Sequence, residues 1–112
     1  MDYMKELNVA ITVCDKDGNI LQMNDKSQKT NNGNLVGRNV YDCHPEPART
    51  KLAELMEQRT TNAYTIEKEG VKKLIYQTPW YDNGAFMGLV EFSLEIPSEM
   101  PHYIRRPKAE RM

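Results

Sequence analysis

A cysteine, a histidine and a proline follow one another as Cys43-His44-Pro45, at the end of the stretch that begins with Gly37 and Arg38. A thiol next to an imidazole is the pair that nucleophilic catalysis uses, but such a site also needs a third group that orients the base. Adjacent side chains usually diverge, and the sequence has no serine elbow, phosphate loop or paired-carboxylate motif. We therefore predict no catalytic residues and no enzyme, with a Cys-His nucleophilic pair as the third-ranked function.

The same dipeptide is a weak candidate for a metal. A structural zinc site needs four ligands at workable spacing, and Cys14 and His102 lie far from Cys43 and His44 in the sequence. The sequence therefore predicts no metal site. Haem needs only one or two axial ligands, and either a neutral imidazole or a thiolate can serve, so His44 or Cys43 would suffice for cofactor binding.

Composition limits the class of protein. The chain has 112 residues, with 15 basic and 16 acidic side chains and a net charge of -1, so it fits one domain with no overall attraction to nucleic acid or membranes. No run of 18 apolar residues occurs, and the acidic residues near the start disfavour a secretory signal. The two cysteines do not form a disulfide framework. We expect a cytoplasmic protein with reduced thiols that binds neither nucleic acid nor membranes.

The elements on either side must position the dipeptide. Residues 2 to 8 have apolar side chains on one helical face, and residues 9 to 15 and 20 to 24 form a hairpin around an Asp-Gly turn. A short helix is expected within residues 25 to 33. The next helix begins near Pro45 to Pro47 and ends near Arg59, because proline is tolerated in a first turn, and it buries Leu52, Leu55 and Met56.

Three further strands are predicted over residues 63 to 67, 73 to 81 and 85 to 95, with Gly88 marking a bulge. The fold class is therefore α+β: a five-stranded antiparallel sheet with short helices packed on one face. We divide the chain into an N-terminal helical segment at 1-8, a domain at 9-96, and a basic, flexible C-terminal tail at 97-112. From Pro101 to Met112 the charged residues are Arg105, Arg106, Lys108 and Arg111 against Glu110.

This order of elements resembles the PAS domain over roughly residues 6 to 96, with the second strand ending in Asn24, Gly37-Arg38 before the helix, and a meander ending in Gly88 to Phe92. Cys43-His44-Pro45 is similar to a bacterial PAS subgroup with a Cys-His-Pro stretch before the main helix. The resemblance implies a sensory or regulatory module in signal transduction, which acts through a small ligand, through protein association, or through both. A haem-binding redox or gas sensor that uses His44 or Cys43 is the alternative, and the cofactor stays unknown.

Flavin chemistry is disfavoured. The light-sensing relatives have a cysteine directly after the asparagine, where this sequence has Val40, and Cys43 comes three positions later. The polar flavin contacts expected on the later strands are also replaced here.

A ligand cavity between helix and sheet is expected to combine apolar walls with a few polar groups. The residues assigned to it are Tyr41, Cys43, His44, Met56, Tyr76 and Trp80, and Met23 and Phe92 could form further walls. The same side chains could instead form a plain packed core. Backbone N–H groups at the start of the helix would favour an anionic ligand or a thiolate.

A homodimer is expected, because Tyr3, Met4 and Leu7 could dock on a second copy. Packing against the open face of the same sheet explains these three residues equally well. A small-molecule ligand and a separate signalling protein are the other candidate partners.

Overall fold

Alternating apolar residues around tight turns form a five-stranded antiparallel sheet in the computed structural model, which describes residues 1–107. The strands lie in the order β2-β1-β5-β4-β3, so the first hairpin and the last meander meet along β1 and β5. The strand bounds are β1 Ala10–Asp15, β2 Ile20–Met23, β3 Asn62–Lys68, β4 Val71–Asp82 and β5 Ala85–Ile96.

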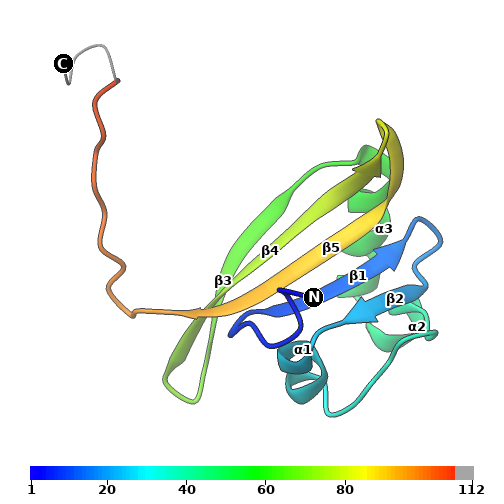
Figure 1. Cartoon of the computed structure of the whole chain (residues 1–112), viewed down its shortest axis with the longest axis horizontal. Coiled ribbons are helices and arrows are strands. Elements are labelled where there is room, and N and C mark those ends of the chain that lie inside the picture. The colour runs from blue at the N-terminus through cyan, green and yellow to red at the C-terminus, as the bar shows by residue number, and fades with distance from the viewer. Residues whose placement is uncertain (108–112) are drawn as a thin grey trace.

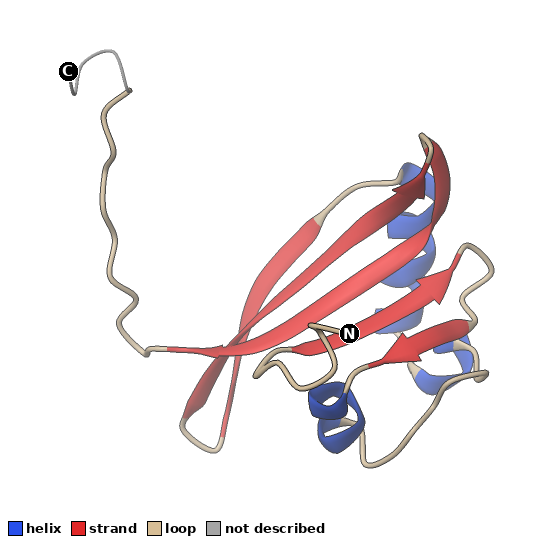
Figure 2. Cartoon of the chain, viewed as in Figure 1, coloured by secondary structure: helices blue, strands red, loops and turns tan. Residues whose placement is uncertain are grey.

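Three short helices lie on one side of this sheet and leave the other side open (Figures 1 and 2). They are α1 at Asp25–Thr30, α2 at Val40–Cys43 and α3 at Ala48–Gln58. The expected α+β architecture with helices on one face is confirmed. Within residues 1–107, no helix has the length and apolar character needed to cross a membrane.

The predicted helix at residues 2 to 8 is wrong, because the structure has only turns at residues 3 to 6. Two i to i+3 hydrogen bonds form there, from Lys5 N to Asp2 O and from Leu7 N to Met4 O. The Met4 carbonyl also accepts from Asn24 Nδ2, and the Lys5 carbonyl accepts from Asp25 N. These tertiary bonds take the acceptors that a helix would need for its own ladder.

The side chain of Asn24 joins three parts of the fold. It is only 3% exposed. Its Oδ1 accepts from the N–H groups of Ile11 and Ser27, at 2.9 and 3.1 Å, and its Nδ2 donates to the carbonyls of Met4 and Val9. This single amide therefore caps α1 and holds both β1 and the N-terminal segment against it.

The core lies between the helices and the inner face of the sheet. It is formed by Cys14, Ile20, Met23, Val40, Leu52, Met56 and Leu89. Leu55 of α3 is 2% exposed, so the predicted burial of Leu52, Leu55 and Met56 is confirmed. The end of α3 is also close to its predicted position, with Arg59 as a left-handed C-cap.

The bulge expected near Gly88 is confirmed one position away. Trp80 pairs with Gly88 and Tyr81 pairs with Phe86, so Met87 is the extra residue of β5. Gly88 itself lies against β1: a Cβ at this position would be 2.0 Å from the carbonyl oxygen of Cys14. Trp80 Nε1 donates to the same oxygen at 2.9 Å, although Trp80 is in β4 and β5 lies between the two strands.

Residues 97–107 contain no helix or strand and lead away from the sheet (Figure 1). Arg105 and Arg106 of the basic tail are exposed. Lys108, Glu110 and Arg111 lie outside the described residues, and the flexibility of the tail stays a prediction.

Replacing Leu55 by Ala should lower the free energy of unfolding by about 2 to 4 kcal/mol, because a buried leucine loses both transfer free energy and packing. Chemical denaturation measures this loss. Leu21→Ala is the matched control, because Leu21 is 48% exposed and surface changes usually stay within about 0.5 kcal/mol. Equal losses in the two variants would show that α3 does not cover the core.

Replacing Gly88 by Ala should destabilise the fold by about 2 kcal/mol more than Gly84→Ala, because only the first substitution adds overpacking to the cost of a positive φ. Both glycines have positive φ, at 155° and 82°, but no atom lies within 4 Å of a Cβ at Gly84. Thermal unfolding of the two variants compares them. Equal destabilisation would mean that β5 and β1 do not approach as closely as described.

Candidate functional site

The Cys43-His44 dipeptide is positioned by an asparagine that ties α2 to the first hairpin. Asn39 Oδ1 caps α2 by accepting from Tyr41 N at 3.0 Å, while Asn39 Nδ2 donates to the carbonyl of Asp17. Backbone hydrogen bonds from Ile20 N to Arg38 O and from Val40 N to Gly18 O add to this link. Helix α2 was not predicted from the sequence. It places its last residue, Cys43, over the inner face of the sheet.

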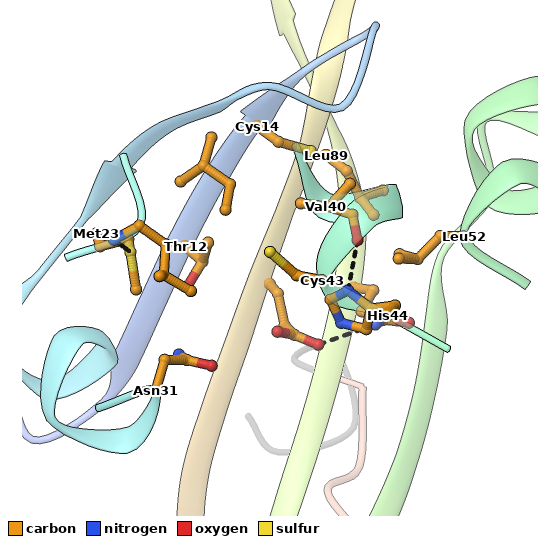
Figure 3. A pocket seen from close by; sticks show the side chains of 13 residues that line it. Thr12, Cys14, Met23, Asn31, Val40, Cys43, His44, Leu52 and Leu89 are labelled. Atoms are coloured by element: carbon orange, nitrogen blue, oxygen red, sulfur yellow. Dashed lines mark hydrogen bonds between the residues drawn. The ribbon is translucent and has the colours of Figure 1, made fainter. Parts of the chain in front are cut away.

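A cavity of about 290 Å³ lies between the helices and the sheet (Figure 3). Cys43 and His44 both line it, and their role in ligand binding stays a prediction. The other lining residues are Thr12, Cys14, Ile20, Met23, Asn31, Leu35, Val40, Leu52, Gln77, Leu89 and Glu91. The cavity thus combines aliphatic walls with a small set of polar groups, which is typical of small-molecule sites.

The side chains of Cys43 and His44 diverge within this cavity. The thiol points toward the side formed by Thr12 and Met23, whereas the imidazole lies beside Leu52 (Figure 3). Among the described residues, no hydrogen bond joins the thiol to the ring. The two side chains therefore lack the contact that a nucleophile and its base require.

The imidazole of His44 is held by its own helix. Nδ1 lies 2.7 Å from the carbonyl oxygen of Val40. Because a carbonyl oxygen only accepts, Nδ1 carries the hydrogen, and Nε2 of the neutral ring is left as an acceptor or ligand atom. His44 thus caps the end of α2 and keeps one nitrogen free.

A row of polar side chains crosses the inner face of the sheet. The strand register aligns Asn62, Gln77, Glu91 and Thr12 on four neighbouring strands. Asn62 Nδ2 donates to Gln77 Oε1 at 3.0 Å, and Gln77 Nε2 donates to Glu91 Oε1 at 2.9 Å. Gln77 is buried, so both ends of its amide have partners, as burial demands.

The second cysteine of the cavity is a protonated thiol. Burial raises the pKa of Cys14 to about 11, and a hydrogen bond with the Leu89 backbone opposes this rise. At neutral pH Cys14 therefore acts as a small apolar wall. Within the described residues, no group of three or more His, Cys, Asp or Glu side chains is arranged to hold a metal ion.

Four of the residues assigned to the cavity do not line it. Met56 is buried in the core, and the ring of Tyr41 packs on Gly18. Side chains alternate along a strand, so Tyr76 and Trp80 project from the face opposite Gln77. The expected aromatic walls are therefore wrong. Phe92, which contacts Tyr76 with a centroid distance of 6.5 Å, lies on that outer face too, whereas Met23 does line the cavity.

The sequence reasoning missed Gln77 and Glu91. Both are polar residues at core-facing positions of strands that also contain apolar and aromatic residues. Polar residues inside such strands were the available signal, but their alignment depends on a register that the sequence does not show.

A second hollow of about 290 Å³ adjoins the cavity and is lined by Ala48, Lys51, Asn62 and Tyr64 together with four residues that it shares with the first. The shared residues are His44, Leu52, Gln77 and Glu91. They separate the two hollows, so a molecule in either one would meet both Glu91 and His44.

Comparisons with solved structures find the same architecture elsewhere. The C-terminal domain of a Streptococcus mutans protein is 26% identical with a TM-score of 0.67, covering 82% of this chain and 78% of that chain. The PAS domain of histidine kinase ThkA is 19% identical with a TM-score of 0.64, covering 78% and 98%. The PAS domain of Bordetella pertussis BvgS is 16% identical with a TM-score of 0.63, covering 96% and 85%.

A comparison with curated proteins finds no match. The family model described as the PAS fold, however, matches residues 4–99. This match spans all five strands and all three helices, including the cavity between them. The chain therefore belongs to the PAS family.

Proposed function

We propose that this chain is a sensory or regulatory module which holds a small ligand between α2, α3 and the sheet and acts through protein association. The cavity carries this proposal. Its volume of about 290 Å³ lies at the lower end of small-molecule sites, which span about 300 to 1,000 Å³. A ligand of one or two rings would fit this space.

The lining also separates two kinds of contact. The apolar contacts come from Ile20, Met23, Leu35, Val40, Leu52 and Leu89. The polar groups Gln77, Glu91 and His44 are fixed by hydrogen bonds to protein atoms, so they would orient a ligand without being reordered themselves. A plain packed core would have no use for this fixed polar row, which supports the ligand reading.

The haem alternative rests on His44 Nε2, because the hydrogen bond to Val40 uses the other ring nitrogen and Nε2 could serve as an axial ligand. The space does not fit a haem macrocycle, because a cavity of about 290 Å³ has room for a ligand of one or two rings only. The thirteen lining residues also include no arginine or lysine to pair with haem propionates. The small-ligand reading is therefore the better supported of the two.

Association with a second copy is the second part of the proposal. Tyr3, Met4 and Leu7 are 76%, 47% and 42% exposed. The backbone between them is nonetheless fixed, because Asn24 binds the Met4 carbonyl and Lys5 Nζ lies 3.1 Å from Asp25 Oδ2. A fixed segment that presents apolar side chains to water is suited to docking. A separate signalling protein is the further partner we propose, by analogy with the kinase that contains the ThkA domain.

Native mass spectrometry of the chain purified from its own host should detect a bound small molecule. Cys43→Trp should expel it by filling the cavity, whereas Cys43→Ser should retain it because the size is preserved. An absorbance scan of the same samples tests haem through a Soret band. A chain that carries no extra mass in wild-type form, and whose melting temperature is unchanged by cavity filling, would contradict the ligand proposal.

Deleting residues 1 to 7 should lower the sedimentation mass from that of a dimer toward that of a monomer. Leu7→Lys should do the same with the backbone contacts intact, because a charge in a dimer contact is costly to bury. Leu21→Lys is the control, since Leu21 is comparably exposed but lies on β2. A full-length chain that is monomeric at high micromolar concentration would refute the dimer.

A further inference from the structure

The cavity holds one carboxylate and no fixed positive charge. Glu91 is the only acidic residue among the thirteen that line it, and none of them is a lysine or arginine. In the part of the chain that the structure describes, the only salt bridge joins Lys5 and Asp25, so Glu91 has no cationic partner in the protein. The charge of the lining therefore favours a cation, opposite in sign to the ligand expected from the start of the main helix.

A chain of two hydrogen bonds ends on the carboxylate of Glu91. Asn62 donates to Gln77, and Gln77 donates to Glu91 Oε1. The amide of Gln77 cannot turn without breaking both bonds, since its oxygen and nitrogen would exchange places. Gln77 Nε2 is therefore the donor to Oε1 of this carboxylate, and the second oxygen, Oε2, has no donor among residues 1–107.

His44 adds a second acceptor on the other side of the site. Its Nδ1–H is used by the Val40 carbonyl, so Nε2 is the acceptor atom of the neutral ring. Glu91 and His44 both line both hollows. Whatever enters therefore meets two groups that accept hydrogen bonds, one of them charged.

We propose that the cavity binds a small organic ammonium ion, whose N–H groups lie between Glu91 and His44 and whose apolar body packs on the aliphatic walls. This inference rests on the proposed ligand-binding function and adds the chemical class of the ligand. The charge of Glu91 is also felt by its neighbours: after burial, it is the second cause that raises the pKa of Tyr64. Among the residues that line either hollow, the one lysine is Lys51, which lines only the adjacent hollow.

Three probes of equal skeleton test the sign of the charge: phenethylammonium, phenethyl alcohol and phenylacetate. Each is titrated into the full chain, and binding is followed by amide chemical shifts. We expect phenethylammonium to bind about tenfold or more tightly than the alcohol, because a hydrogen bond to a charged group adds that much. Phenylacetate should bind most weakly, since its carboxylate meets Glu91.

Glu91→Gln should remove the preference for the ammonium probe and leave the binding of the alcohol. Glu95→Gln is the matched control: it removes the same charge from the same strand, but Glu95 is exposed and lines neither hollow. The Glu95→Gln variant should keep the preference for the ammonium probe. Thermal unfolding of both variants confirms that they are folded, and the ranking of the probes on the wild-type chain is decisive without them.

The outcomes distinguish failure of the ammonium site from failure of the proposed ligand-binding function. Equal affinities of the three probes, a preference for phenylacetate, or a preference for ammonium that survives in Glu91→Gln would overturn the ammonium site and leave the ligand-holding cavity standing. Failure of all three to bind at millimolar concentration would overturn both.

Discussion

The buried amide of Asn24 is the interaction on which the rest of this fold depends. An amide has two donor hydrogens and an acceptor oxygen, and at Asn24 all of them are used within the protein. They determine where α1 begins, where β1 lies relative to it, and how the N-terminal segment folds back. No apolar residue could replace these bonds, because the N–H groups of Ile11 and Ser27 and the carbonyl of Val9 would lose the partner that Asn24 supplies. This one side chain therefore also positions the parts of the cavity wall that come from β1 and from the end of α1.

Two kinds of interaction position the residues of the cavity, namely hydrophobic burial and directed hydrogen bonds. Its aliphatic walls belong to the core, so hydrophobic burial alone determines them. Its polar groups are each fixed by a directed hydrogen bond, from Asn39 through α2 to His44 and from Asn62 through Gln77 to Glu91. Burial can be satisfied by many arrangements, whereas directed bonds select one. The apolar part can therefore adapt to a ligand while the polar part stays in place.

The sequence predicts the elements of this fold well, because strands and long helices have strong local patterns. The first hairpin, the three-stranded meander, α3 and the irregularity beside Gly88 all follow from spacing and turn chemistry. The N-terminal helix fails because its carbonyls bind Asn24 and Asp25, which is a tertiary effect. Helix α2 was not predicted, because its four residues depend on the Asn39 cap, which also binds the first hairpin.

The site is harder to predict than the fold. Cys43 and His44 could be identified from their chemistry, and the structure places both on the cavity. Tyr76 and Trp80 were chosen for their size, but strand alternation turns them to the outer face. Gln77 and Glu91 can be recognised as a pair only once the register of β4 and β5 is known, because that register places them side by side. A single sequence contains the alternation of each strand but not the pairing between strands.

The indole that crosses β5 has a spectroscopic consequence. Trp80 is the only tryptophan in the chain, and its N–H binds the backbone of Cys14, whose side chain lines the cavity on the other face. The tryptophan fluorescence of the protein thus comes from this one residue, which lies in β4 and reaches across β5 to β1. Any event in the cavity that separates β1 from β5 changes the polarity around that ring and the colour of its emission. The protein therefore contains an intrinsic fluorescent probe of the sheet, on the face opposite the cavity.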